Sequence, residues 1–403
     1  MTRKLDLRTG RPVWFAYPAP RISASPLRRS LAADVLVVGL GISGAMIAEA
    51  LTARGLSVVG IDRRRPLAGS TPATTALVQY EIDKPLTLLG AAIGKERAAR
   101  AWRRSRLAVA NLHGRIAELG IECGARLVPS HYLAGTVLDA GGLDEEAAAR
   151  REAGIAATRL KPAEVEARTG IAGRSALLGQ GNLALNPRRL AAGLLLAAEA
   201  RGARFYRDAE IVATESEGGA LRAATASGRE IRAQHIVLST GYELAAMAPK
   251  APHRIVSTWA IATKRQKARL WPAGGFVWEA SEPYLYMRAT DDGRVVCGGE
   301  DEDFADEESR DALIGEKAAT IAAKLGRLMP RLDPEPEFRW AGSFGTTATG
   351  LPFIGRVPRR KGLFAVMGYG GNGITYSQVA SEIVATAILG GRDADADLYA
   401  FPG

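Results

Sequence analysis

Short apolar runs alternate with an amphipathic stretch near the start of the chain. Residues 33–38 form an uncharged run after Asp34, typical of a strand buried on both faces. An alanine-rich stretch, 45–53, predicts a helix that ends before Gly55, and a second apolar run, 56–61, predicts another strand. A strand, a turn, a helix and a strand within about 30 residues are typical of a parallel βαβ unit.

A glycine motif joins the first predicted strand to the helix, with Gly39, Gly41 and Gly44 in the spacing GxGxxG. The first glycine permits a tight turn, the second lets a pyrophosphate approach the backbone, and the third lets helix and strand pack closely. The helix N-terminus offers free N–H groups and the positive end of a dipole. Asp62 follows the second strand, where a carboxylate accepts hydrogen bonds from an adenosine ribose. The unit therefore predicts dinucleotide binding.

The remaining pattern predicts further elements. Helices are expected at 91–120, 190–200 and 374–389, and the stretch 143–170 is expected to contain another, alanine-rich helical region. Strands are expected at 205–214, 229–231 and 236–238. Alternating polar and apolar residues at 284–298 indicate a separate antiparallel sheet. Prolines at positions 12, 18, 20 and 26 predict an N-terminal extension, residues 1–32, without regular elements.

Composition narrows the class of protein. The 403 residues are 47% hydrophobic and 24% charged, which fits a protein with a substantial buried core. The longest nearly uncharged apolar stretch, 190–198, is much shorter than the roughly 20 residues of a membrane span. We therefore expect no transmembrane segment.

The net charge of +10 weakly favours acidic small molecules or anionic surfaces as partners. The stripe of Arg97, Arg100 and Arg103 is expected on a solvated helix face, since no aromatic or glycine motif of a nucleic-acid module accompanies it. No nucleic-acid partner is expected. The acidic run 300–303 lacks the spacing of a calcium loop and is expected to be a charged loop.

The two cysteines, Cys123 and Cys297, are far apart, and the four histidines show no zinc-binding spacing. No metal site is expected, and a reducing compartment is indicated. The first 28 residues lack the apolar core of a signal peptide, so the cytoplasm is the expected location.

Two features favour FAD over NAD. A loop of small residues, 69–76, follows Asp62 closely, where an NAD dehydrogenase normally continues with strand–helix units. A second glycine-rich helix start, 368–373, lies far along the chain. This arrangement suits a long ligand held at its pyrophosphate by one helix and at its far end by another.

Taken in order, the motifs resemble those of the FAD-dependent amine and amino-acid oxidoreductases typified by glycine oxidase, D-amino-acid oxidase and monomeric sarcosine oxidase. The resemblance spans roughly residues 33–392. It rests on the glycine motif with Asp62, on 69–77, Ser239-Thr240-Gly241, 284–299, Trp340-Ala341-Gly342, 350–355 and 368–375.

The resemblance implies an α/β fold in which a Rossmann-type FAD-binding domain is interleaved with an α+β substrate domain carrying a mainly antiparallel sheet. The implied FAD-binding segments are 33–90, 180–250 and 340–403, and the implied substrate segments are 91–179 and 251–339. The residues expected to bind FAD are Gly39, Gly41, Ile42, Ser43, Gly44, Asp62, Arg63, Ser70, Thr71, Thr75, Ala76, Leu77, Glu210, Thr240, Gly241, Gly371, Asn372, Gly373, Ile374 and Thr375.

At the flavin end, the N–H groups of Asn372, Gly373 and Ile374 are expected to stabilise negative charge on reduced flavin. Neither cysteine and no histidine falls in a motif that attaches flavin covalently, so non-covalent FAD is expected.

The chain departs from the family at three positions: Phe344 and Gly371 replace arginines, and Thr349 replaces an aspartate. A guanidinium is the natural bidentate partner of a carboxylate, so the loss of both arginines disfavours a simple α-amino acid. The residues expected to contact substrate are Tyr284, Tyr286, Arg288, Phe344 and Tyr369. The aromatic ones would suit an alkylamine, or an N-substituted substrate whose charge lies further away. Ordinary core packing is the alternative for these aromatics.

The implied reaction transfers a hydride from the carbon next to an amine nitrogen to flavin N5, and the imine then hydrolyses in water. The pattern identifies no catalytic side chain. Either oxygen or another acceptor, such as a quinone or a carrier protein, would reoxidise the flavin. Another class also stays open, a flavoprotein whose FAD is structural.

Overall fold

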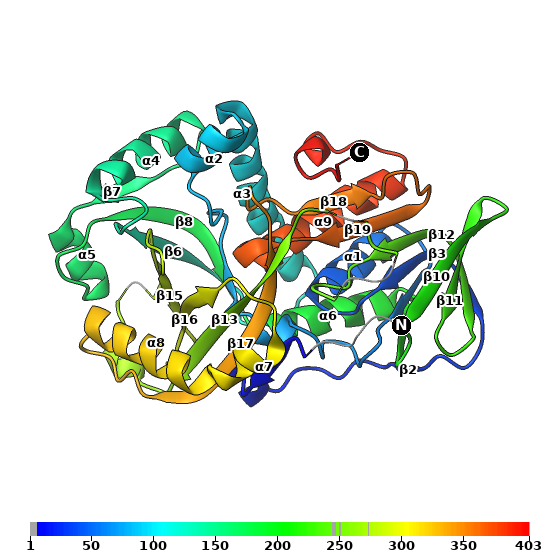
Figure 1. Ribbon diagram of the computed structural model, residues 1–403, viewed down its shortest axis with the longest axis horizontal. Coiled ribbons are helices and arrows are strands. Elements are labelled where there is room, and N and C mark those ends of the chain that lie inside the picture. Colours follow the sequence, from blue (N-terminus) through cyan, green and yellow to red (C-terminus); the bar gives the residue numbers. More distant parts are fainter. Residues whose placement is uncertain (1–5, 244–246, 250, 273, 403) are drawn as a thin grey trace.

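The computed structural model describes residues 6–243, 247–249, 251–272 and 274–402. Two sheets lie side by side, each with helices packed against it (Figure 1). The predicted fold class is confirmed: a Rossmann-type α/β unit stands beside a mainly antiparallel sheet.

Nine strands of the described chain form the first sheet. Its parallel centre consists of β3 (Leu31–Val38), β4 (Val58–Ile61), β9 (Arg204–Arg207) and β12 (Glu230–Leu238). The remaining strands are β2 (Ser25–Pro26), β10 (Ile211–Glu217), β11 (Ala220–Thr225), β18 (Phe353–Arg356) and β19 (Leu363–Met367). Residues 35–38 of β3 are fully buried, as the apolar run predicts.

Three helices accompany this sheet: α1 (Ile42–Thr52), α6 (Pro187–Ala200) and α9 (Gly373–Ile388) (Figure 1). Helix α1 contacts both α6 and α9, although α9 follows it by more than 300 residues. Their apolar side chains share one core with β3 and β12. This packing brings the C-terminal glycine-rich segment beside the N-terminal glycine motif.

Ten strands of the described chain form the second sheet, which is antiparallel except where β14 pairs with β6. Its strands are β1 (Arg8–Gly10), β5 (Leu77–Val78), β6 (Arg126–Leu133), β7 (Thr158–Leu160), β8 (Ala176–Ala184), β13 (Arg254–Thr263), β14 (Phe276–Glu279), β15 (Leu285–Ala289), β16 (Val295–Glu302) and β17 (Pro336–Thr346). The antiparallel pair predicted at 284–298 is β15 with β16. Strand β5 and the end of β17 come from segments predicted to belong to the FAD-binding domain, so the chain passes between the two units within those segments.

The other helices are α2 (Leu86–Ile93), α3 (Lys95–Glu118), α4 (Ala140–Glu152), α5 (Pro162–Thr169), α7 (Glu307–Ala312) and α8 (Ile314–Leu328). Gly94, with φ +89°, separates α2 from α3 inside the region predicted as one helix. On α3, Arg97 and Arg100 pair with Asp397, and Arg103 pairs with Glu96. Among the described helices, none combines the length and the apolar composition that a bilayer-spanning segment needs.

The prediction that residues 1–32 contain no regular element is wrong for the described part, which starts at Asp6. Strand β1 pairs with β17, a single 3₁₀ turn covers Val13–Ala16, and β2 pairs with β9. Trp14 is only 2% exposed, and its indole N–H donates to the carbonyl of Thr74 at 2.6 Å. Pro12, Pro18 and Pro20 lie outside the strands, and Pro26 lies in β2 at the edge of its sheet, where proline is tolerated, so tertiary contacts order the segment despite its composition.

The acidic run 300–303 is also not a loop throughout. Residues 300–302 complete β16, whose Glu302 lies opposite Ser257 of β13. The pairing shifts between Ser257 and Trp259, and Glu300 has φ +59°, which marks a bulge. The partner strand therefore extends a strand that the charged sequence does not favour.

Candidate active site

One long cavity lies between the two sheets and is bounded by residues from both. It is lined by most of the predicted site residues: Gly39, Gly41, Ile42, Ser43, Asp62, Arg63, Ser70, Thr71, Thr75, Leu77, Glu210, Thr240, Gly241, Gly371, Asn372, Gly373, Ile374, Tyr284, Tyr286, Phe344 and Tyr369. Gly44, Ala76, Thr375 and Arg288 are not in this lining. Glycine motifs more than 300 residues apart thus line a single space.

The N-terminal glycine turn is tight enough to require glycine. Gly39 has φ +98°, and a Cβ there would lie 2.4 Å from the carbonyl oxygen of Ser239. A Cβ on Gly44 would lie 1.8 Å from the carbonyl oxygen of Gly39. Gly44 therefore acts through close packing of helix on strand, as predicted, and not by lining the cavity.

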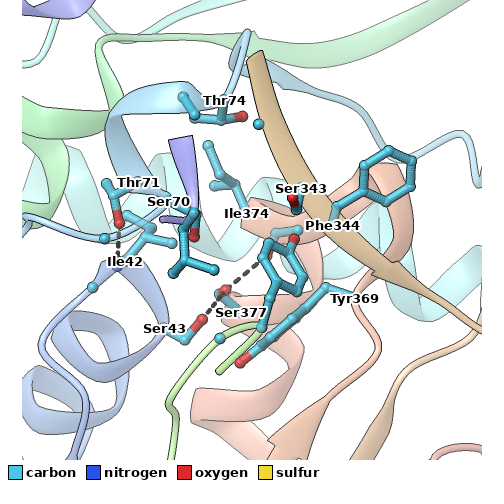
Figure 2. A pocket seen from close by; sticks show the side chains of 18 of the residues that line it. Ile42, Ser43, Ser70, Thr71, Thr74, Ser343, Phe344, Tyr369, Ile374 and Ser377 are labelled. Atoms are coloured by element: carbon cyan, nitrogen blue, oxygen red, sulfur yellow. Dashed lines mark hydrogen bonds between the residues drawn. The ribbon is translucent and has the colours of Figure 1, made fainter. Parts of the chain in front are cut away.

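Side chains from distant segments surround the start of α1. The N–H of Ile42 donates to the hydroxyl of Thr71 at 3.0 Å, and Ser43 and Ser377 share a 2.7 Å hydrogen bond (Figure 2). Thr71 belongs to the small-residue loop and Ser377 to α9. The loop and both glycine-motif helices are thus held together at this point.

Asp62 fixes the turn with both carboxylate oxygens. Oδ2 accepts from the N–H of Leu40 at 2.8 Å, and Oδ1 accepts from the N–H of Arg64 at 2.8 Å. Burial raises the pKa of this carboxyl above its ordinary value, although the two backbone hydrogen bonds oppose the shift. Asp62 also lines the cavity, so its predicted contact with a ribose stays compatible with the structure.

Several charged side chains pair with one another near Asp62, and one of them, Glu243, is not part of any sequence motif. Arg63 lies 3.7 Å from Glu210, and both Arg63 and Arg64 pair with Glu243. Glu243 is nearly buried and stands just after the predicted turn at 239–241. Its partners precede it by 179 and 180 residues, so a local pattern could not have found it.

The loop 69–76 is held in place mainly through its backbone. Its Gly69, Ala73 and Thr74 carbonyls accept from Arg8, Trp340 and Trp14. Ala76 has φ +58°, and its carbonyl accepts from Arg288 at 2.6 Å. Ala76 thus shapes the loop without lining the cavity.

The far end of the cavity is formed where α9 begins. The Asn372 side chain donates to the carbonyl of Glu81 at 2.9 Å and accepts from the N–H of Asp83 at 3.1 Å. The hydroxyl of Thr375 donates to the carbonyl of Gln79 at 2.7 Å. Asn372 and Thr375 therefore tie α9 to the segment 79–83, leaving the helix N-terminus facing the cavity.

Aromatic side chains line the cavity at this end. The rings of Tyr284 and Tyr286 lie 5.6 Å apart, and Tyr242 meets Tyr369 edge-on at 6.4 Å. Phe344 extends from β17 and Tyr369 lies before α9, on two different elements around the space (Figure 2). The sequence predicts every one of these aromatic residues except Tyr242 as a substrate contact. For the turn that precedes Tyr242, it predicts only that the backbone contacts the ligand. The predicted aromatic pocket is present as a set of lining residues.

Arg288 lies elsewhere. It is 3% exposed, and its Nη1 donates to the carbonyls of Ala76 and Leu185 at 2.6 and 2.9 Å. It lines a second, smaller cavity together with Trp14. Burial lowers its pKa to about 9. The expected contact between Arg288 and substrate therefore receives no support, and the side chain supports the loop instead.

The glycine turn, the cavity between two sheets and the second helix N-terminus match a known pattern. A family profile described as FAD dependent oxidoreductase (DAO) matches residues 34–387. The chain belongs to the DAO family of FAD-dependent oxidoreductases. Its cofactor is FAD, and it is an oxidoreductase of the kind whose members act on amino acids and amines.

Individual relatives are distant. Probable oxidoreductase OrdL of Rhizobium meliloti is 26% identical over 230 residues, which cover 54% of this chain and 51% of that protein, about half the length of each. Gamma-glutamylputrescine oxidoreductase of Escherichia coli is 24% identical over 94% of this chain and 89% of its own. The crystal structure of glycine oxidase from Geobacillus kaustophilus superposes with a TM-score of 0.75 at 21% identity, covering 92% of this chain and 98% of that chain.

The residues of the DAO-family cavity fit FAD. The turn at Gly39 and Gly44 leaves no room for side chains where a pyrophosphate would meet the N-terminus of α1. The α9 N-terminus faces the other end of the same cavity. None of the described lining residues is a cysteine or histidine, and non-covalent attachment of FAD stays a prediction.

Proposed function

We propose that this DAO-family protein oxidises a C–N bond of an amine, or of an N-substituted amino acid whose charge lies further from that bond, to an imine, which hydrolyses in water. The observation that supports this substrate class is the lining of the aromatic end. The arginines in the described lining are Arg63 and Arg64, and both pair with Glu243 at the nucleotide end. A substrate carboxylate would lack a guanidinium partner among the described lining residues at the aromatic end.

In this proposal, separate groups of residues bind the cofactor and enclose the substrate. Gly39, Gly41 and the N-terminus of α1 would hold the pyrophosphate, and Asp62 would accept hydrogen bonds from the ribose. The N–H groups at the start of α9 would stabilise negative charge at the pyrimidine end of the cofactor. FAD, when bound, supplies the hydride acceptor. Tyr284, Tyr286, Phe344 and Tyr369 would exclude water from the reacting carbon.

Names of relatives support an amine or amino-acid substrate. One is gamma-glutamylputrescine oxidoreductase, and the superposed structure is a glycine oxidase. Since no arginine stands at the aromatic end of the described lining, an amine is favoured over glycine.

The test is anaerobic mixing of the purified holoenzyme with amines, N-methyl amino acids, proline and free amino acids, followed at the flavin band near about 450 nm. Bleaching by amines, with little by glycine or alanine, is expected; N-methyl amino acids and proline, which carry the same α-carboxylate as glycine, should bleach the flavin less than amines do. Bleaching by glycine alone would contradict the substrate class, and bleaching by none would favour a structural role for FAD. Reoxidation by air or by an added quinone then identifies the acceptor.

A further inference from the structure

An acidic side chain that no sequence motif marks lies in the aromatic end of the cavity. Asp83 follows β5 and lines the cavity. Its position is deep in the protein, yet its side chain is open to the cavity. One of its oxygens, Oδ2, accepts from the N–H of Gly371 at 2.7 Å. The carboxylate is therefore held beside the N-terminus of α9.

Asp83 has no cationic partner among the described residues. Its neighbour Lys84 donates instead to the carbonyl of Ala348 at 2.8 Å. No hydrogen bond to Oδ1 is formed within the described part of the chain. The charge that acts on Asp83 is that of another acid, Asp301, which raises its pKa further. A carboxylate that lines a cavity without a cationic partner is stabilised when a cationic ligand binds beside it.

Three tyrosine rings line the same cavity as this carboxylate. Tyr242 and Tyr284 line the cavity together with Asp83, and burial first, with the charge of Asp83 as a smaller cause, raises the pKa of both phenols. Tyr369 packs edge-on against Tyr242, and all three rings line the same cavity. A carboxylate and tyrosine rings that line one cavity can attract an organic ammonium group, through ion pairing and cation–π attraction together.

A metal-binding role and a purely structural role for Asp83 both fit the geometry less well. A metal ion needs several oxygen ligands, and no group of three or more His, Cys, Asp or Glu in the described chain has the geometry to hold one. A purely structural role would need only the Oδ2 bond to Gly371, which a neutral asparagine or serine also provides. Neither role requires a carboxylate that is open to the cavity.

We propose that Asp83, with Tyr242, Tyr284 and Tyr369, forms a subsite for an organic ammonium group, so that the substrate carries an alkylammonium cation. This inference rests on the proposed function and names the part of the substrate that the site selects. The ammonium form is bound by the carboxylate form of Asp83. Burial raises the pKa of Asp83 to about 6, so the subsite binds cations above that pH.

The test uses binding, not turnover. Choline and its neutral carbon isostere 3,3-dimethyl-1-butanol have the same shape and differ in charge. Each is titrated anaerobically into the holoenzyme while the flavin absorbance spectrum is followed. Wild type is expected to bind choline at least tenfold more tightly than the isostere. The Asp83→Asn variant is expected to lose that tenfold preference, and Asp144→Asn, a change at an exposed residue paired with Arg159, is expected to keep it.

A second measurement requires no variant. In the wild-type holoenzyme, choline affinity is expected to rise with pH through about 6, the pKa of Asp83, while isostere affinity stays flat. Equal affinities of wild type for the two probes, or an unchanged preference in Asp83→Asn, would overturn the subsite. If the variant does not fold or loses FAD, a flat pH profile for choline in wild type would overturn it instead.

The proposed function can fail separately. If no amine bleaches the flavin while choline binding depends on Asp83, the subsite stands and the oxidation chemistry does not. If amines bleach the flavin equally well in wild type and Asp83→Asn and choline shows no preference, the oxidation stands and the subsite does not.

Discussion

The N–H of Gly371 donates a 2.7 Å hydrogen bond to the carboxylate of Asp83, and this contact joins segments 288 residues apart. A Cβ at position 371 would lie 2.8 Å from Oδ2 of Asp83. The glycine at position 371, where the family resemblance leads us to expect arginine, thus makes room for an acid. Together, Gly371 and Asp83 give the cavity at the start of α9 a negative charge, where the expected arginine would give a positive one.

Gly44→Ala should disrupt the nucleotide end. The added methyl group would meet the backbone carbonyl of Gly39, which has no flexible side chain to move aside. We expect a loss of about 1–3 kcal/mol in the free energy of unfolding, together with weaker retention of FAD. Denaturant unfolding and the flavin-to-protein absorbance ratio after dialysis measure both. Gly315→Ala, on α8 with open space around the Cβ, is the matched control and should change neither.

Asp62→Ala should weaken FAD binding while the fold persists. The substitution removes the expected ribose contact and leaves the N–H groups of Leu40 and Arg64 without their acceptor. Fluorescence titration of the apoprotein with FAD should give a dissociation constant raised at least tenfold. Asp62→Asn keeps one acceptor oxygen and should fall between the two. Full flavin occupancy of Asp62→Ala after dialysis would show that Asp62 has no role in binding.

Phe344→Arg should shift preference toward small amino acids. The position lines the aromatic end of the cavity on β17, where an arginine would supply the carboxylate partner that the described lining lacks. The ratio of kcat/KM for glycine to that for the best amine is expected to rise at least tenfold. Phe344→Leu, which removes the ring without adding charge, should lower amine use without improving glycine. An unmoved ratio in Phe344→Arg would place this side chain outside the substrate contact.

The titration of the Asp83 carboxyl should affect how thermal stability depends on pH. Its folded-state pKa, about 6, is raised above the ordinary value of 3.8 by burial. A raised acid pKa means that folding favours the protonated form, so this contribution to stability is present below pH of about 4 and lost as pH rises through about 6. Asp83→Asn, which keeps an acceptor for Gly371, should therefore gain Tm relative to wild type between pH 4 and pH 8. A difference in Tm that is constant across this range would contradict the assigned pKa.

The local sequence was sufficient for the elements that a few adjacent residues determine. Gly39, Gly44 and Asp62 lie in one βαβ unit, where the spacing of glycines and apolar runs itself dictates turn, helix and strand. The same holds for the antiparallel pair β15 and β16, which follows from alternation. These short-range patterns, taken in order, also indicated the family and FAD.

Tertiary structure decided what depends on distant partners. Trp14 is buried because the loop at Thr74 accepts its N–H, although the surrounding prolines favour an irregular segment. Arg288 is directed to the Ala76 carbonyl and away from the main cavity. The position of Asp83 in the cavity depends on its hydrogen bond from Gly371, and the tyrosines that line the same cavity come from other segments of the chain. Side-chain direction and burial arise from packing between segments hundreds of residues apart, and a one-dimensional pattern carries no record of which segments will meet.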